Sequence, residues 1–520
     1  MNGKATEPEI TEPNMRALLG SVGLDVEYLQ AEGNTLVQAG ADGEGIPVLD
    51  HVGGYGSLLL GHNNPEIVAH AKELLDARTP VHIQFSRHST ANRLALAVNR
   101  ILHRELGTTE DYLAFFASTG AEAVETGIKH AELDRQMRVG ALLAEIDSHV
   151  EEVRAAAREG GVAVAGSVGA ELGVSGPEEL IAHVRAHNEA VLAKPPLFLA
   201  LEGSFHGKLA GSVQLTHNPV VRGPFQALAA QARFVPIDQP DALAKVVDSE
   251  QASLLDLVVD GDVVTVVPRD YPVFTAFLVE PIQGEGGINV LGEEFATRLR
   301  RTADALEVPV IVDEIQCGMG RTGTFLAGSA VGLRGDYYTL AKSLGGGIAK
   351  ISLLLIRRSA YRPDFEFLHS STFAKDGFST AIALKVVELL EANGGAAYRL
   401  AADLGTVLKS ALDGVKDDFP DVVEAVRGKG LMLGLEFADQ TGSASEAVSD
   451  AARQGILGYA IAGYLLREHR IRIFPTASAP NTLRFEPSIQ LTGEEIDRTA
   501  AALRAVSAIL RDDPGRIFRP

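Results

Sequence analysis

Two polar residues end apolar stretches in the middle of the chain. Asp313 ends "VPVIVD", and Lys342 follows "YYTLA", shortly before three consecutive glycines. A lysine sheltered from water has a lowered pKa, so its amine can attack a carbonyl carbon. A carboxylate buried at a strand end needs a compensating positive partner. Each residue alone could be a helix cap, a structural ion pair or a surface group. Together they indicate Schiff-base chemistry supported by a carboxylate.

Two further segments could hold a phosphorylated aromatic ring. In "FFASTGAEAVETGIKHA" an apolar strand is followed by Ser118 to Ala121 and a helix, whose first N–H groups can bind a phosphate. Ser118 or Thr119 could also be only a helix N-cap. Phe205 in "EGSFHGK" could stack on a ring. Lysine, carboxylate, phosphate turn and aromatic together predict pyridoxal phosphate, in which a carboxylate keeps the pyridine nitrogen protonated.

The elements that must position these residues are short apolar strands separated by helical patterns. They run over 197–203, 274–281, 308–314 and 351–356. This alternation predicts an α/β fold with a mostly parallel sheet between helices. Ligands of such sheets bind at the carboxyl ends of the strands, where these polar residues lie.

The pattern also predicts domains and insertions. We expect an amino-terminal arm and joining segment over 1–85, a large cofactor-binding domain over 86–377, and a smaller carboxy-terminal domain over 378–520. A helical pair inserted at about 133–196 should have a capping box at Ser175 and Glu178 with Pro177 in the first turn. A second insertion, at about 248–271, should form a hairpin around Asp260-Gly261-Asp262.

Composition limits the class of protein. The 520 residues are 46% hydrophobic and carry a formal charge of -21, which disfavours binding to nucleic acid or to an anionic membrane surface. A single cysteine, Cys317, cannot form an internal disulfide, and no signal peptide or apolar run of membrane-spanning length is visible. The histidines show no clear metal-ligand spacing, so no metal is expected. We predict a cytoplasmic protein.

Three long motifs, "VEPIQGEGG", "VIVDEIQCGMGRTG" and "LAKSLGGG", occur in an order and spacing that resemble those of the class III aminotransferases. These are fold-type I pyridoxal-phosphate enzymes related to ornithine, acetylornithine and 4-aminobutyrate aminotransferases. The resemblance runs from about Val48 to Asp497, interrupted by the two insertions. It implies a large domain with a seven-stranded-type, mostly parallel sheet and a smaller α+β carboxy-terminal domain.

The resemblance also implies roles for individual residues. Lys342 would form the Schiff base with the cofactor and move the proton at the substrate α-carbon, and Asp313 would pair with the pyridinium nitrogen. Gln316 would lie near the phenolic oxygen, and Glu280 beside the substrate end of the cofactor. The remaining implied cofactor ligands are the phosphate-binding residues Thr119, Gly120 and Ala121 and the stacking residue Phe205. Glu314 is interpreted as structural support or a contact to "GRTG".

Three more residues match positions at the edge of the family's active site. Thr372 in "HSSTF" would reach the cofactor phosphate of a neighbouring subunit, which implies a homodimer with shared active sites. Arg484 in "TLRFEP" would grip a substrate carboxylate; its alternative is a salt bridge that closes the small domain. Tyr55 would line the substrate pocket, or be a core tyrosine.

The chain departs from the family pattern at three places. Ser118 replaces the usual asparagine, and Ala374 to Gly377 replace Gly-Gly-Asn-Pro. The proline that commonly follows the triple glycine is replaced around "GGGIAKIS", which makes Lys350 an unusual charge close to the Lys342 loop. The leading hypothesis is transamination between a small-molecule amino donor and a carbonyl acceptor, neither of which the sequence identifies. The alternative is another pyridoxal-phosphate reaction on the same fold, such as racemisation, decarboxylation, replacement or carbon–carbon bond formation, because Lys342 and Asp313 serve all of these equally.

Overall fold

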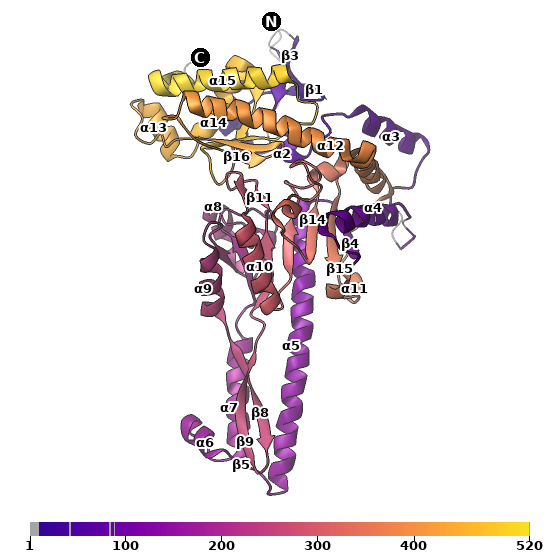
Figure 1. The fold of residues 1–520 in the computed structure, drawn as a ribbon, viewed down its shortest axis with the longest axis vertical. Helices are drawn as coiled ribbons and strands as arrows, with labels where there is room; N and C mark the ends of the chain where they lie inside the picture. The colour runs from indigo at the N-terminus through magenta and orange to yellow at the C-terminus, as the bar shows by residue number, and fades with distance from the viewer. Residues whose placement is uncertain (1–9, 41–42, 83–84, 88, 519–520) are drawn as a thin grey trace.

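The computed structural model describes residues 10–40, 43–82, 85–87 and 89–518. Its centre is a seven-stranded sheet with the order β4-β15-β14-β13-β10-β6-β7 (Figure 1). The strands are β4 (Tyr112–Ala117), β6 (Leu197–Leu201), β7 (Ala232–Val235), β10 (Phe274–Val279), β13 (Val310–Asp313), β14 (Tyr337–Leu340) and β15 (Ser352–Arg357). Only β15 runs antiparallel to its neighbours. The predicted α/β fold is confirmed.

Both faces of this sheet are buried. Along β10, Phe277 and Val279 belong to one apolar cluster, whereas Ala276 and Leu278 belong to the other, as the two-residue period of a strand requires. Helix α5 (Gly120–Arg158) covers the face of Ala276, and α10 (Glu293–Ala305) packs into the cluster on the other face. Near-continuous apolar strands are therefore the expected sequence pattern here.

Eight further helices precede the carboxy-terminal sheet in the described part of the chain. They are α1 (Pro13–Ser21), α2 (Gly53–Gly56), α3 (Pro65–Asp76), α4 (Ser89–Leu106), α8 (Pro219–Arg222), α9 (Pro240–Glu250), α11 (Phe365–Leu368) and α12 (Gly377–Asp418). Helix α12 is interrupted at 392–395 by non-helical backbone. No helix in the described ranges is long and apolar enough to cross a membrane.

The carboxy-terminal part has an antiparallel sheet of order β16-β17-β20-β19. Its elements are β16 (Val423–Lys429), β17 (Met432–Phe437), α13 (Glu446–Arg453), α14 (Leu457–His469), β19 (Phe474–Pro475), β20 (Thr482–Phe485) and α15 (Gly493–Asp512). An amino-terminal sheet of β1 (Tyr28–Glu32), β2 (Thr35–Ala39) and β3 (Gly45–Asp50) joins it through β18 (Ile471–Arg472), which pairs in parallel with β3. The two ends of the chain thus share one sheet.

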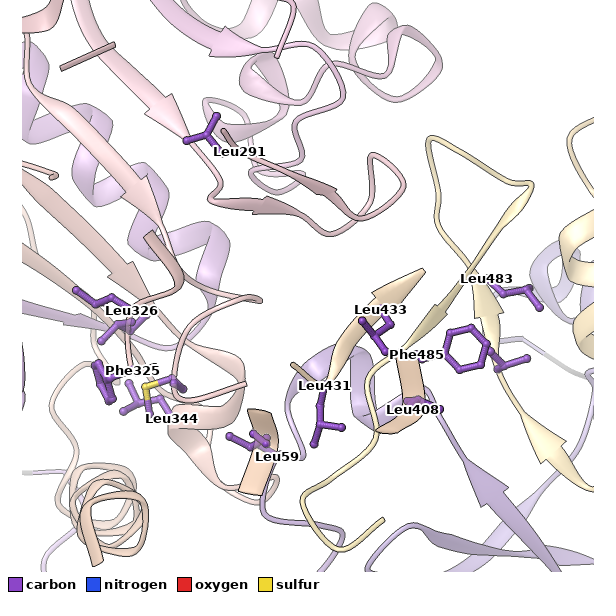
Figure 2. Packing of buried hydrophobic residues seen from close by; sticks show 14 of the residues in the cluster. Leu59, Leu291, Phe325, Leu326, Leu344, Leu408, Leu431, Leu433, Leu483 and Phe485 are labelled. Carbon is purple, nitrogen blue, oxygen red and sulfur yellow. The ribbon is translucent and has the colours of Figure 1, made fainter. Parts of the chain in front are cut away.

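A single apolar cluster links these parts. Figure 2 shows Leu59 from the amino-terminal segment, Phe325 and Leu344 from loops after β13 and β14, and Leu433 and Phe485 from the carboxy-terminal sheet. All five side chains are almost completely buried. The loops that carry the polar residues therefore rest on a closely packed core, which limits their movement.

The two predicted insertions form one arm that projects from the body (Figure 1). Helix α5 continues without a break from the Ser118–Ala121 turn into the arm, where it packs with α7 (Pro177–Leu192) and the hairpin of β8 (Ser253–Asp260) and β9 (Val263–Asp270). The segment between the helices contains β5 (Ala163–Val164), which pairs with β9, and α6 (Gly166–Leu172). The arm's own core is formed by Val150, Val153, Leu180, Ile181, Val184, Leu257 and Val264.

Of two local predictions for the arm, the hairpin is confirmed and the capping box is wrong. The hairpin around Asp260 is present, with Asp260 paired to Val263. The capping box at Ser175 and Glu178 is wrong: Gly176 is the N-cap, and Glu179 accepts the Ser175 N–H at 2.7 Å. The helix begins one residue later than expected, which moves the N3 position from Glu178 to Glu179.

The exposed edge of β8 is bound by a side chain instead of another strand. Asn188 of α7 accepts the Leu255 N–H at 2.7 Å and donates to the Leu255 carbonyl at 2.9 Å. A side-chain amide can make the same pair of hydrogen bonds as a neighbouring strand, and Asn188 is buried. This contact joins the two insertions.

Candidate active site

A cavity of about 370 Å³ opens at the carboxyl edge of the central sheet. Asp313 ends β13, and Lys342, Glu280 and Phe205 follow β14, β10 and β6. The predicted residues that line it are Thr119, Gly120, Ala121, Phe205, Glu280, Asp313, Gln316 and Lys342. Thr372, Tyr55 and Arg484 are not among the lining residues. The β15 strand is antiparallel, so it begins at this edge and adds Lys350 and Ile351 to the lining.

Asp313 is buried and held by three protein donors. Its Oδ1 accepts hydrogen bonds from the Ile315 N–H and the Thr339 hydroxyl, both at 3.1 Å, and its Oδ2 is 2.8 Å from His206 Nδ1. These contacts fix the orientation of the carboxylate.

Sequence reasoning missed His206. Its ring is buried; burial opposes a positive charge there, but the hydrogen bond and charge of Asp313 outweigh burial and raise the pKa of His206. The other ring nitrogen, Nε2, is buried without a hydrogen-bond partner among the described residues. The available signal was its position beside Phe205 in the loop after β6, because residues that follow a strand at the carboxyl edge of the sheet are candidates for lining the cavity.

Lys342 is half-buried and has an unusual backbone. Its φ of 47° lies in the left-handed region, which costs a non-glycine residue about 1–3 kcal/mol and is common at functional sites. Burial and the charge of Arg484 lower the pKa of Lys342, against the opposing charges of Glu486, Glu285 and Asp313. This shift increases the fraction of neutral amine, the form that attacks carbonyl carbon.

Glu280 faces the same part of the cavity. Its carboxyl group accepts the Phe205 N–H at 2.9 Å and the Gly284 N–H at 3.3 Å. Burial raises the pKa of Glu280 to about 7, with Asp313 adding to the shift and His206 opposing it. The group can therefore exchange a proton near neutral pH.

Thr119 is the N-cap of α5. Its hydroxyl accepts the Glu122 N–H at 3.3 Å, and the Glu122 carboxylate accepts the Ser118 and Thr119 N–H groups at 2.8 and 2.9 Å. The first-turn N–H groups of Gly120 and Ala121 have no partner within the helix, as at every helix start. Both residues line the cavity, so their N–H groups are available to an anion there.

A buried charge cluster lies next to the cavity. Arg484 pairs with Glu285, and its Nε is 3.2 Å from Glu486. The Gln316 amide, which lines the cavity, donates to both oxygens of Glu486 at 2.9 and 3.1 Å. Sequence reasoning did not single out Glu285 or Glu486, because their burial depends on contact between the carboxy-terminal sheet and the loop after β10.

Tyr55 lies against this cluster. The Arg484 guanidinium carbon is 4.9 Å from the centroid of the Tyr55 ring, a cation–π distance. Tyr55 is 47% exposed, so the alternative that it is a core tyrosine is wrong.

Glu314 has a different environment from Asp313. Its two oxygens accept the Ala327 and Gly328 N–H groups at 2.9 and 2.8 Å, and burial raises the pKa of Glu314 to about 7. Glu314 does not line the cavity. Its hydrogen bonds support the segment after "GRTG" and not that motif itself.

The cavity fits pyridoxal phosphate in size and chemistry. Its volume lies in the range of small-ligand sites, and it holds an amine with a lowered pKa, a buried carboxylate and free helix N–H groups. A side chain at Gly207 would lie 2.6 Å from Ala121 Cβ, so glycine there permits the close approach of the two loops. When bound, the cofactor supplies an electron sink for the bond broken at a substrate carbon.

Fold and cavity together define a pyridoxal-phosphate-dependent transferase. A family model described as "Aminotransferase class-III" matches residues 21–478. The chain therefore belongs to the class III aminotransferase family. It catalyses pyridoxal-phosphate-dependent transamination, as the resemblance in its motifs implies.

Solved structures share the fold. Ornithine aminotransferase from Toxoplasma gondii is 20% identical, with 98% of this chain and 97% of that chain covered and a TM-score of 0.67. A thermostable omega transaminase variant from Pseudomonas jessenii is 19% identical, with 99% and 97% covered and a TM-score of 0.68. A transaminase from the marine bacterium Virgibacillus is 18% identical, with 94% of each chain covered and a TM-score of 0.66.

Proposed function

We propose that Lys342 is the residue that attaches the cofactor and moves the proton at the substrate carbon. The observation that carries this proposal is the cavity itself, which both Lys342 and Asp313 line at one edge of the sheet. The pKa of Lys342 is lowered by burial, which is the direction that a proton-accepting amine requires. Asp313 would stabilise a protonated pyridine nitrogen, and Gln316 would lie near the ring oxygen.

The phosphate would bind at the start of α5. Gly120 and Ala121 would bind it through their N–H groups, whereas Thr119 already uses its hydroxyl and N–H in the helix cap. Thr119 would thus act mainly by fixing the turn. Phe205 would stack on the ring, and its N–H bond to Glu280 ties the stacking loop to the substrate side.

Arg484 and Tyr55 are the residues proposed for the substrate end of the site. A substrate carboxylate would meet an Arg484 that two carboxylates already neutralise, so it would bind only after displacing Glu285 or Glu486. The two ion pairs of Arg484 support its alternative role as a salt bridge that closes the small domain. Tyr55 would line this end of the pocket.

We further propose a homodimer with shared active sites, in which Thr372 reaches the partner's cofactor phosphate. Thr372 is exposed, and large apolar side chains near it in sequence are exposed as well, including Phe367, Leu368 and Phe373. Such exposed side chains support burial against a second copy. A cytoplasmic location is proposed from the single cysteine, which is buried as a free thiol.

A screen of amino donors against the purified holoenzyme tests the function. With a true donor and no acceptor, the absorbance of the bound cofactor should change and an oxo product should appear by mass spectrometry. If no donor of any class changes the absorbance, transamination is refuted. If product forms by racemisation or decarboxylation instead, the alternative reaction class is correct.

Replacing Lys342 tests its assignment. After borohydride reduction, mass spectrometry should find the cofactor on Lys342 in the wild type and no adduct in Lys342→Ala. Activity should fall about 1000-fold or more, because both attachment and proton transfer are lost. Lys194→Ala, at an exposed lysine after α7, is the matched control and should keep the adduct on Lys342. An adduct that persists at another lysine in Lys342→Ala would refute the assignment.

A further inference from the structure

We propose that Lys350 is a cofactor-phosphate ligand supplied by the same chain. This inference rests on the proposed placement of the phosphate at the Ser118–Ala121 turn. Lys350 lies in "GGGIAKIS", where the proline that commonly follows the family's glycines is replaced; it is an unusual charge close to Lys342, and the function described so far does not use it.

Strand register brings Lys350 to the phosphate turn. In the antiparallel β15–β4 pair, Ser352 lies opposite Ala117 and Leu353 opposite Phe116. The paired strands end there; the same register continued by one and two positions would place Ile351 beside Ser118 and Lys350 beside Thr119. All four residues line the cavity. A lysine side chain is long enough to reach an anion bound at the neighbouring helix start.

A phosphate bound at the Ser118–Ala121 turn would be stabilised by a positively charged side chain nearby. The Glu122 carboxylate already accepts the Ser118 and Thr119 N–H groups, so a phosphate at the turn would lie beside a negative charge and have fewer N–H donors. The helix start contributes only about half a positive charge. An additional ammonium group would offset the repulsion from Glu122.

Of the two lysines that line the cavity, Lys350 is the one that can supply this positive charge. The lining contains no arginine, and its two lysines are Lys342 and Lys350. Lys342 is committed to covalent attachment. Lys350 is exposed, and among the described residues its amine makes no ion pair or hydrogen bond that would have to be broken first. A phosphate could therefore bind it without displacing another partner.

A comparison of the affinities for pyridoxal phosphate and for pyridoxal tests whether Lys350 binds the phosphate group. Apoenzyme made from the full chain is titrated with pyridoxal phosphate and with pyridoxal, which lacks the phosphate. Lys350→Met should weaken binding of pyridoxal phosphate about tenfold, the effect of one charge-assisted hydrogen bond, and leave pyridoxal binding within about twofold. Inorganic phosphate should compete less well with pyridoxal phosphate in this variant than in the wild type.

Two variants serve as comparisons. Lys350→Arg keeps the charge and should retain most of the affinity for pyridoxal phosphate. Lys194→Met removes an exposed lysine in the segment after α7 and should leave both affinities unchanged. Size-exclusion chromatography and thermal melting of each apoenzyme show whether a loss of affinity reflects a changed assembly or fold.

The outcomes distinguish this inference from the proposal on which it rests. If the wild type prefers pyridoxal phosphate and Lys350→Met keeps that preference, Lys350 is not a phosphate ligand, although the turn can be. If the wild type itself has no such preference, the placement of the phosphate is wrong. If Lys350→Met instead raises only the KM of carboxylate-bearing substrates, Lys350 binds substrate and the inference is overturned.

Discussion

Hydrogen-bond donors surround the buried carboxylate of Asp313. Three donors hold its carboxylate, and one of them, His206, is itself a buried ring with a raised pKa. The two groups stabilise each other's charged forms, so each offsets part of the other's desolvation. Glu314, one residue further on, binds two backbone N–H groups and no side-chain cation. Adjacent carboxylates thus have different chemistry because the strand end turns them toward different loops.

At the residue scale, Asp313→Asn should change His206 as well as the reaction. Without the carboxylate, burial dominates and the pKa of His206 should fall. In the wild type the raised pKa means that the pair stabilises the fold fully below the ordinary value of 6.5, and that this contribution is lost as pH rises through the folded pKa. In the variant, a pKa below 6.5 reverses the sign, so stability should fall as pH falls.

NMR titration of labelled histidine measures the pKa, and thermal melts between pH 5 and pH 8 measure the stability. The transamination rate should fall about 100-fold, comparable to the loss of another preorganised electrostatic group. Cofactor absorbance provides the control for occupancy. An unchanged His206 titration together with an unchanged rate would contradict this interpretation of Asp313.

At the scale of elements, the arm extends the helix that forms the phosphate turn. Helix α5 begins with the capping box at Thr119 and continues into the arm, where it packs against α7 and β8. The sequence showed two separate insertions because a linear pattern does not reveal contact between segments far apart in the chain. Asn188 and Leu255 make one such contact through two hydrogen bonds.

Asn188→Ala should therefore loosen the arm. Loss of two buried hydrogen bonds should cost about 2 kcal/mol and leave the Leu255 backbone groups unpaired. Hydrogen exchange should become faster at the β8 amides and stay unchanged in the central sheet. Asn188→Asp keeps an acceptor for the Leu255 N–H and loses the donor, so it should have an intermediate effect if the aspartate remains in place. Glu189→Ala, at an exposed neighbour, is the control, and equal exchange in this control and in Asn188→Ala would refute the role of Asn188.

At the scale of the whole molecule, the amino- and carboxy-terminal parts share a sheet and an apolar core (Figure 2). The buried Arg484 cluster depends on this packing, since Arg484 comes from β20 and Glu285 from the loop after β10. A movement of one part relative to the other would change which charged groups lie near Lys342. In the proposed dimer each active site also depends on the other subunit, because Thr372 would complete the site of the partner subunit.

Subunit mixing tests the shared sites. Lys342→Ala and Thr372→Ala proteins should each have low activity. In a mixed dimer one site combines an intact Lys342 with an intact Thr372, so random exchange of equal amounts should restore about a quarter of wild-type activity. Mixing Lys342→Ala with the Lys342→Ala/Thr372→Ala double variant should restore none. If native mass spectrometry shows mixed dimers and activity does not recover, the sites are not shared in this way.

The sequence by itself determined the strands, the edge of the sheet where chemistry occurs, and the residues directly after each strand. Asp313, Lys342, Glu280 and Phe205 could be placed because an apolar strand has a visible end and parallel strands end at one edge. Only the tertiary structure decided the contacts that cross between segments: His206 on Asp313, Glu486 on Gln316, and the joining of two insertions into one arm. Periodicity records which face of an element is buried, whereas these contacts depend on how distant elements pack, which no local pattern contains.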